Sequence, residues 1–287
     1  MPVHEFRVGA FRCAVVSDHP EGAWPWPWES YFRPATGVAE GELERALAEE
    51  GEVRPHPLIG YNCVAVDTGE HRIVIDTGLG LDYTEYGQKG AILGRLVEGL
   101  EEAGFAPPEI DTVVLTHLHT DHTRGAMWSG RRTFPHARHV VAELEARFWE
   151  RETENRPGQD GVFRSSHQLL EVAGPTLKRI GLEDEIAPGV TAVPAAGHTP
   201  GHMAVLIESE GERLLCLGDT FYDRVQLRRP DWWTPMDLDG PRSVASRKRL
   251  VAMAADEGIP VVLYHLPFPG LGRIRRSGTV HAWVDGL

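Results

Sequence analysis

The sequence predicts an α/β fold in a single domain that spans residues 1–287. Three observations carry this prediction. Short apolar runs typical of strands occur in turn with longer stretches of helical composition. A chain of 287 residues with 41% hydrophobic residues can bury one large core. The sequence contains neither internal repeats nor a linker-like segment that would divide it into two domains.

The first half of the chain contains strand-like runs separated by helical or irregular segments. Apolar and β-branched runs predict strands at residues 11–17, 61–67, 72–76, 111–115 and 137–142. Helical composition predicts helices at residues 41–50, 91–103 and 143–151. A turn at residues 68–71 joins two of the strands, so a β-hairpin is expected there. The glycine-rich loop that follows at residues 76–80 lacks the Walker lysine and the dinucleotide spacing, which favours a tight turn over a phosphate cradle.

The second half of the chain predicts a series of short strands and one long helix. Strands are expected at residues 190–193, 203–208, 213–217 and 260–264, and the helix at residues 241–257. Residues 156–161 contain Pro and Gly and predict an exposed loop.

Composition and charge exclude several classes of protein. The chain has 29 basic and 42 acidic residues, a net charge of −13, and no basic cluster that would serve a nucleic acid. No apolar run approaches the ~20 residues of a membrane helix, and no secretory signal is recognised. The three cysteines lie in apolar runs without C-x-x-C spacing, which predicts buried thiols in a reducing compartment. We therefore expect a cytoplasmic protein that contacts neither membranes nor nucleic acids.

A cluster of metal-ligating residues follows the predicted strand at residues 111–115. His117, His119, Asp121 and His122 stand in the register H-x-H-x-D-H. Imidazole nitrogens and carboxylate oxygens are ligands that suit zinc and its first-row neighbours. One metal ion would not accommodate all four side chains, so the spacing indicates two metal ions.

Three further candidate ligands follow other predicted strands. His198 follows the strand at residues 190–193, Asp219 the strand at 213–217, and His265 the strand at 260–264. Strand ends on one edge of a sheet converge in space, and open α/β proteins place their sites there. We expect these side chains to meet the H-x-H-x-D-H cluster.

The order of these motifs resembles the metallo-β-lactamase superfamily of hydrolases from about residue 62 to about residue 272. The resemblance implies a four-layer αββα sandwich with a dinuclear metal site on one edge. It implies the following ligands: His117, His119 and His198 for one metal, Asp121, His122 and His265 for the second, and Asp219 as the bridging carboxylate. Zn²⁺ is the expected metal, with Mn, Fe or Co as other candidates.

Finer details are similar to the branch of N-acyl homoserine lactone lactonases and methyl parathion hydrolase-like enzymes. The similar segments are residues 134–137, 148–149, 187–190 and 265–272. Arg124 departs from this branch, because a glycine commonly follows the motif there. The resemblance implies a hydrolase in which a metal-bridging hydroxide attacks an ester-like bond of a small molecule, with a lactone as the first substrate class. A phosphotriesterase or β-lactamase on the same metals is the alternative, and a diiron redox protein is less favoured.

The catalytic groups expected beside the metals are Asp121 and Tyr222. Asp121 would hold the second metal and relay a proton to the leaving group. Tyr222 stands where the lactonases place a tyrosine that contacts substrate, and it would donate to the developing oxyanion or serve a purely structural role. Asp76, Thr116 and His202 are expected to orient ligands through hydrogen bonds.

An aromatic segment at residues 24–28 alternates tryptophan with proline, which forbids a regular helix or a central strand. Trp26 and Trp28 are candidate substrate contacts on a hydrophobic lip. The same segment would also serve a subunit contact in a homodimer, or its indoles would fold back onto the core. These readings are open at the level of the sequence.

Overall fold

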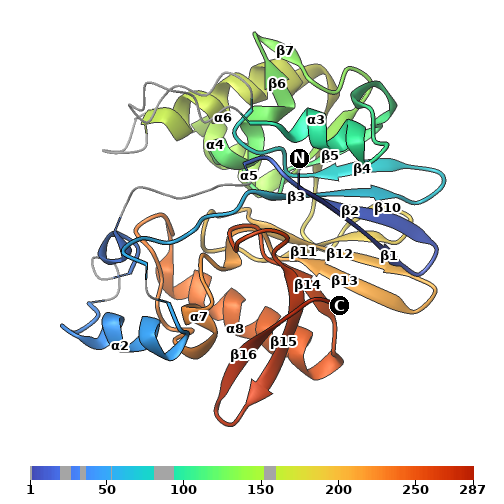
Figure 1. Ribbon diagram of the computed structural model, residues 1–287. Helices are drawn as coiled ribbons and strands as arrows, with labels where there is room; N and C mark the ends of the chain where they lie inside the picture. Colours follow the sequence, from blue (N-terminus) through green and yellow to red (C-terminus); the bar gives the residue numbers. More distant parts are fainter. Residues whose placement is uncertain (1, 20–26, 33–36, 53, 81–93, 152–159) are drawn as a thin grey trace.

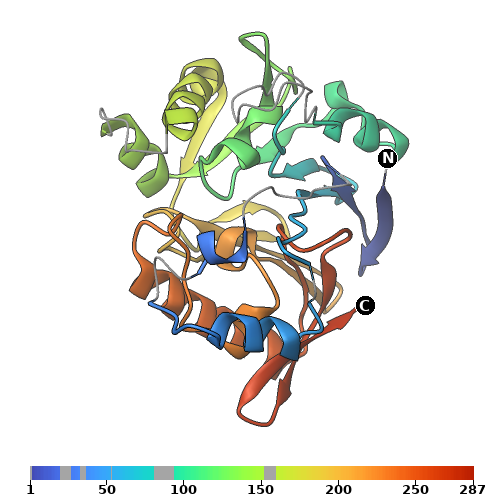
Figure 2. The ribbon, with the colours of Figure 1, turned by 60° about the vertical axis from the view of Figure 1, so that its left-hand side comes forward.

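The computed structural model of the protein has two central sheets with helices on both outer faces (Figure 1). It describes residues 2–19, 27–32, 37–52, 54–80, 94–151 and 160–287. The sheets lie face to face, helices α3 to α6 cover one of them, and α7 and α8 cover the other (Figures 1 and 2). The αββα sandwich implied by the ligand motifs is therefore confirmed.

The first sheet combines an antiparallel half with a parallel half. Its strands, in spatial order, are β1 (Val3–Val8), β2 (Phe11–Ser17), β3 (Asn62–Asp67), β4 (Arg72–Ile75), β5 (Thr112–Val114), β8 (Arg138–Ala142) and β9 (Leu177–Ile180). Strands β3 and β4 pair antiparallel, which confirms the predicted hairpin. From β4 onward the pairs are parallel, so the carboxyl ends of β4, β5 and β8 point to the same edge.

The second sheet is antiparallel except for one central pair. Its strands are β10 (Glu185–Ala187), β11 (Val190–Pro194), β12 (Met203–Ser209), β13 (Glu212–Cys216), β14 (Pro260–Val262), β15 (Leu271–Ser277) and β16 (Val280–Asp285). Strands β13 and β14 run parallel, which places Asp219 and His265 beyond neighbouring strand ends. A separate short ribbon pairs β6 (Met127–Trp128) with β7 (Arg131–Arg132).

The helices vary from one turn to five turns. The α-helices are α2 (Glu42–Glu49), α3 (Leu96–Glu102), α4 (Thr120–Thr123), α5 (Glu143–Arg151), α6 (Asp160–Ala173), α7 (Val225–Arg228) and α8 (Gly240–Glu257). The 3-10 helices are η1 (Trp28–Ser30), η2 (Pro107–Glu109), η3 (Arg124–Ala126), η4 (Gly174–Thr176) and η5 (Gly218–Thr220). None of the helices in the described ranges is long and apolar enough to cross a membrane.

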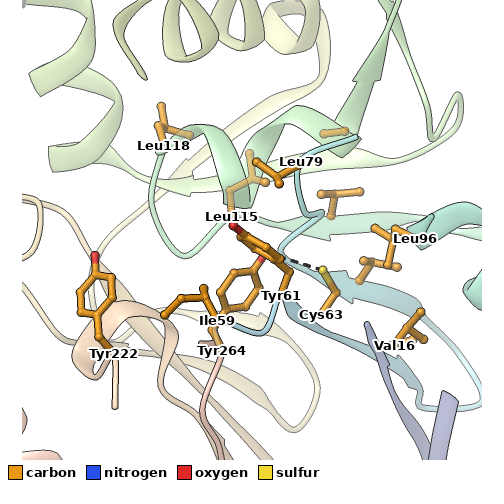
Figure 3. Close-up of a cluster of buried hydrophobic side chains, with 14 of the residues drawn as sticks. Val16, Ile59, Tyr61, Cys63, Leu79, Leu96, Leu115, Leu118, Tyr222 and Tyr264 are labelled. Atoms are coloured by element: carbon orange, nitrogen blue, oxygen red, sulfur yellow. Dashed lines mark hydrogen bonds between the residues drawn. The ribbon is translucent and has the colours of Figure 1, made fainter. Parts of the chain in front are cut away.

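Alternating strand residues divide the core into layers. Val15 and Val64 face the inner core between the sheets, whereas Ala14 and Val16 face the helices on the outer side. This two-sided burial explains why β2 and β3 are apolar almost throughout. Figure 3 shows part of the outer core, in which the Cys63 thiol lies 3.9 Å from the hydroxyl of Tyr264.

The three cysteines confirm one prediction about the core. Cys13, Cys63 and Cys216 are free and buried. Burial raises the pKa of the Cys13 thiol to about 12, so this thiol is protonated at neutral pH. The three residues pack as small apolar side chains.

Several elements differ from the sequence-based expectation. The sequence pattern does not predict the strands β1, β9, β10, β15 and β16 or the helix α6. β15 carries three arginines and lies next to the outermost strand β16, where alternation of apolar residues is weak. The loop predicted at residues 156–161 is wrong at 160–161, which begin α6, and its first four residues lie outside the described ranges. α3 begins at Leu96 rather than at residue 91, and residues 91–93 are not described.

Candidate metal centre

The first group of candidate ligands consists of two histidines from the first sheet and two residues from the second. Nitrogen or oxygen atoms of His117, His119, His198 and Asp219 all lie within 4.8 Å of one another. Nε2 of His198 is 2.8 Å from Nδ1 of His119 and 3.3 Å from Oδ2 of Asp219. All four residues are buried. The structure therefore brings together ends of β5, β11 and β13, as expected.

The second group lies next to the first. Asp121, His122 and His265 form it, again with their ligand atoms within 4.8 Å of one another. Nε2 of His122 lies 2.9 Å from Oδ1 of Asp219, and Nε2 of His265 lies 3.2 Å from Oδ2 of the same carboxylate. Asp219 is thus placed between the two groups.

The donor atoms of the two groups fit metal ions. Nε2 of His117 is buried and has no hydrogen-bond partner among the described residues, and Nε2 of His122 and Oδ1 of Asp219 lie 2.9 Å apart in a geometry that does not make a hydrogen bond. Leaving buried polar atoms unpaired costs about 1–3 kcal/mol each, so such a cluster requires a partner. Nitrogen and carboxylate donors match a divalent first-row metal, and the residues present fit two such ions.

The two groups of candidate ligands differ in the pKa of their histidines. Burial, together with the neighbouring imidazoles, holds the pKa of His117 and of His119 well below the ordinary value. Both rings are therefore neutral, which is the form that binds a metal. Burial acts to lower the pKa of His122 and of His265, but the neighbouring carboxylates, Asp219 foremost, together outweigh it and raise both.

Asp76 supports the ligand loop from the end of β4. Its Oδ1 accepts the backbone N–H of Thr116, and its Oδ2 accepts the Thr116 hydroxyl, each at 2.8 Å. Oδ2 also lies 2.8 Å from Nδ1 of His122, which leaves Nε2 of that ring facing Asp219. Asp76 adopts a positive φ of 57°, a conformation that aspartate tolerates better than most residues. The hydrogen bonds expected for Asp76 and Thr116 are present.

His202 supports Asp219 from the opposite side. Its Nδ1 donates to the carbonyl of Ala195 at 2.9 Å, and its Nε2 accepts the backbone N–H of Asp219 at 3.1 Å. This pairing requires a neutral ring, and burial lowers the pKa of His202 to about 4. A Cβ at Gly218 would stand 2.6 Å from Nε2 of His202, so only glycine permits this approach.

Glu145 on α5 joins the two loops that carry the first ligand group, and the sequence did not single it out. Its Oε1 accepts the backbone N–H of Leu118 at 3.0 Å and the Trp149 indole at 2.8 Å. Its Oε2 accepts the Thr199 hydroxyl at 2.6 Å and the N–H of Gly201 at 3.0 Å. One buried carboxylate thus ties the loop between His117 and His119 to the turn that follows His198. A lone glutamate in an amphipathic helix carries no sequence signal for this role.

Tyr222 lies at the edge of both ligand groups. Its hydroxyl donates to Oδ2 of Asp219 at 3.0 Å, and its ring stacks on His265 with 5.0 Å between ring centres and 13° between planes. Burial raises the pKa of Tyr222, and the Asp219 carboxylate raises it further, so the hydroxyl keeps its proton. The proton is available beside the metal centre.

Trp28, which belongs to the described part of the aromatic segment, does not form an exposed lip. Trp28 is only 4% exposed, packs in the core with Tyr31 and Phe32, and donates its indole N–H to the carbonyl of Arg54 at 2.9 Å. Among the readings that are open at the level of the sequence, the Trp28 indole takes the one in which it folds back onto the core. Trp26 lies outside the described residues. Arg124, which departs from the branch pattern, donates to Oε1 of Gln168 on α6 at 2.6 Å.

The match to a family model agrees with this geometry. The model of the metallo-beta-lactamase superfamily matches residues 56–264. The chain belongs to this superfamily. The resemblance of its motifs is confirmed, and the protein is a metal-dependent hydrolase with a His/Asp metal-binding cluster.

The chain is also similar to several hydrolases and lactonases, both in sequence and in structure. An N-acyl homoserine lactonase of Bacillus sp is 27% identical over 221 residues, 70% of this chain and 79% of that protein. A probable metallo-hydrolase of Mycobacterium tuberculosis is 29% identical over 182 residues, 55% of this chain and 56% of that protein. The structure of AidC, a dizinc quorum-quenching lactonase with a bound homoserine product, has a TM-score of 0.86 and 26% identity and covers 99% of this chain and 97% of that chain. The hydrolase AbOPH has a TM-score of 0.87 and 25% identity, with the same coverage.

Proposed function

We propose that this protein is a dinuclear zinc hydrolase that opens lactones, with N-acyl homoserine lactones as the substrate class. The observation that carries the proposal is the carboxylate of Asp219, which lies within reach of ligand nitrogens from both groups. A buried carboxylate between two sets of histidines supports two metal ions rather than one.

His117, His119 and His198 would hold one ion, Asp121, His122 and His265 the other, and Asp219 both. Two divalent ions at such a site supply an activated water and polarise the scissile carbonyl. Side chains of the protein would carry out the proton transfer and stabilise the developing charge.

Asp121 is suited to move the proton. Its side chain is 23% exposed, whereas His122 and Asp219 are almost fully buried. A carboxylate at the metal centre with access to solvent can take a proton from the attacking water and deliver it to the leaving alkoxide. Tyr222 would donate a hydrogen bond from its hydroxyl to the oxygen on which charge develops, since its raised pKa keeps the proton on the phenol.

The choice of a lactone rests on the relatives. One relative by sequence is an N-acyl homoserine lactonase, and one by structure is a lactonase with N-hexanoyl-L-homoserine as product. Nothing in the ligand set itself separates a lactone from a phosphotriester, because the metals and the water are the same. The substrate is therefore tested directly.

The test compares native, metal-free and reconstituted protein on a panel of substrates. We expect hydrolysis of N-hexanoyl homoserine lactone, loss of it after chelation, and its return with Zn²⁺. Elemental analysis should show two zinc ions per chain. Preferred turnover of a phosphotriester or a β-lactam would reject the lactone, and activity that survives in metal-free protein would reject the mechanism.

A pair of histidine variants tests whether His117 is a metal ligand. His117→Ala removes a ligand and should lower kcat/KM by at least about 100-fold. His136→Ala changes an exposed histidine that precedes β8 and should leave kcat/KM unchanged. Equal activity of the two variants would show that His117 is not a ligand.

A further inference from the structure

A buried carboxylate outside both ligand groups faces one of the ligand histidines. Oδ1 of Asp237 lies 3.0 Å from Nδ1 of His198, and both side chains are at most 1% exposed. Asp237 belongs to the segment between α7 and α8. No sequence motif marks it, and it lies 39 positions from His198.

The other oxygen of Asp237 is held in place by the protein. Oδ2 accepts the backbone N–H of Thr234 at 3.1 Å and lies 3.9 Å from the guanidinium of Arg247. The backbone N–H of Leu238 donates to the carbonyl of His198 at 3.0 Å. A side-chain contact and a backbone hydrogen bond therefore both join the Asp237 segment to the turn that bears His198.

Arg247 of α8 lies beside Asp237 and binds the backbone of the segment that carries it. It is a fully buried arginine, and its guanidinium donates to the carbonyls of Thr220, Pro230 and Trp232 at 2.7, 2.9 and 2.7 Å. Thr220 follows Asp219 directly. One cation thus joins the segment that carries Asp237 to the turn that carries the bridging ligand.

The chemistry of the pair selects one form of the His198 ring. A carboxylate has no hydrogen to donate, so the contact with Asp237 requires the proton on Nδ1. Nε2 then carries a lone pair, and it faces the site 2.8 Å from Nδ1 of His119. The Tyr222 hydroxyl is a more distant neighbour of Nδ1, at 3.5 Å, and its own hydrogen points to Asp219.

We propose that Asp237 is a positioning residue that fixes the tautomer and the ring orientation of His198 for metal binding, with Arg247 as its anchor. The proposal rests on the proposed function, since it takes His198 to be a ligand. Carboxylates behind ligating histidines typically contribute 10- to 100-fold in metal affinity.

The experiment compares Asp237→Asn with Asp239→Asn. Asparagine fills the same volume, but its amide can present N–H groups to His198 and favour the wrong tautomer. Asp239 is exposed and caps α8 by accepting the N–H of Arg242, a role that asparagine fills equally well. Zn²⁺ affinity is measured by competition with a chromophoric chelator, together with the visible spectrum of the Co²⁺-loaded protein.

We expect Asp237→Asn to bind one of its two Zn²⁺ ions about 10- to 100-fold more weakly than wild type and to show an altered Co²⁺ spectrum. At saturating Zn²⁺ its KM should change less than its kcat. Asp239→Asn should match wild type in each measurement. Wild-type affinity at both metals in Asp237→Asn would overturn the proposal.

A measurement on wild-type protein keeps the proposal testable if the variant does not fold. In ¹H–¹⁵N spectra of the Zn²⁺-loaded protein, the His198 ring should carry its proton on Nδ1, with the resonance assigned by its loss in His198→Gln. A proton on Nε2 would refute the role of Asp237. A different result, wild-type protein that binds no metal and hydrolyses no substrate, would refute the proposed function itself.

Discussion

Buried carboxylates direct the ligand side chains at the scale of single residues. Asp76 contacts His122, Asp237 contacts His198, and in both pairs the carboxylate faces Nδ1. His265 meets the carbonyl of Gly60 in the same way, with its Nδ1 at 3.0 Å. Each ring therefore presents Nε2 to the candidate metal centre, because the other nitrogen is occupied by an acceptor.

Removal of one hydroxyl tests the role of Tyr222. Tyr222→Phe should lower kcat by about 100-fold while both metal ions stay bound, because a donor to the developing charge is lost. Tyr31→Phe is the control, because it also removes one phenolic hydroxyl. The Tyr31 ring lies 6.2 Å from the Tyr222 ring, measured between ring centres. Steady-state kinetics and elemental analysis give the answer. An unchanged kcat in Tyr222→Phe would contradict a catalytic role for Tyr222 and would assign it a structural role.

A buried aspartate away from the metals gives the fold a pH dependence. Asp18 accepts the backbone N–H groups of Leu79 and Leu96 at 2.7 and 2.9 Å, and burial raises its pKa from 3.8 to about 6. The folded protein therefore binds this proton more tightly than the unfolded chain does. Its contribution to stability is greatest near pH 4 and is lost as the pH rises through about 6.

The Asp18→Asn variant isolates this effect. The difference in unfolding free energy between wild type and variant should change by about 2 kcal/mol between pH 4 and pH 7, with wild type relatively more stable at the lower pH. Urea unfolding at several pH values measures it. A difference that does not vary with pH would contradict the raised pKa.

At the scale of elements, helix α5 is the connection between ligand-bearing loops of the two sheets. Its Glu145 accepts hydrogen bonds from the Leu118 backbone and from Gly201, which lie after β5 and β11. A Cβ at Gly201 would stand 2.2 Å from the backbone nitrogen of Glu145, so the turn approaches the helix as closely as glycine allows. The helix thus holds the loop that contains Leu118 against the turn that contains Gly201.

Glu145→Gln should destabilise the protein and loosen the first metal site. The amide leaves at least one buried N–H or hydroxyl without its acceptor, at a cost of about 1–3 kcal/mol. Glu143→Gln on the same helix breaks an exposed pair with Arg147 and should cost less than about 1 kcal/mol. Urea unfolding of the Zn²⁺-loaded variants compares them. Equal stability of the two would show that Glu145 does not act as this link.

At the scale of the whole molecule, the candidate metal centre lies across both sheets. His117, His119, Asp121 and His122 follow a strand of the first sheet, whereas His198, Asp219 and His265 follow strands of the second. The inner core likewise takes side chains from both sheets. We propose that the two sheets form one cooperative domain, with the metals as cross-links.

Metal removal should therefore lower the stability of the entire fold. A ligand present at 100 times its Kd adds about 2.7 kcal/mol per site, so loss of two ions should lower Tm by on the order of 10 °C. Scanning calorimetry of zinc-loaded and chelated protein tests this, with added Zn²⁺ as the control for reversal. Two separate transitions, or a Tm that chelation does not change, would contradict the cross-link.

The sequence by itself determined the candidate metal ligands that the fold brings together and the family to which the chain belongs. His117 to His122 are close in the chain, and His198, Asp219 and His265 each follow an apolar strand, so local patterns were sufficient to find them. Strand β15 and helix α6 were missed, because β15 carries three arginines and α6 follows a segment with loop composition.

Only the tertiary structure decided which residues support those ligands. Asp18 meets Leu96 across 78 positions, and Asp237 meets His198 across 39. It also decided that Trp28 lies in the core, since exposure depends on the segments packed above a side chain. The physical reason is that a metal ligand is recognised by its own chemistry and its place after a strand. A supporting carboxylate is an ordinary Asp or Glu until folding brings a particular N–H or imidazole within hydrogen-bond distance.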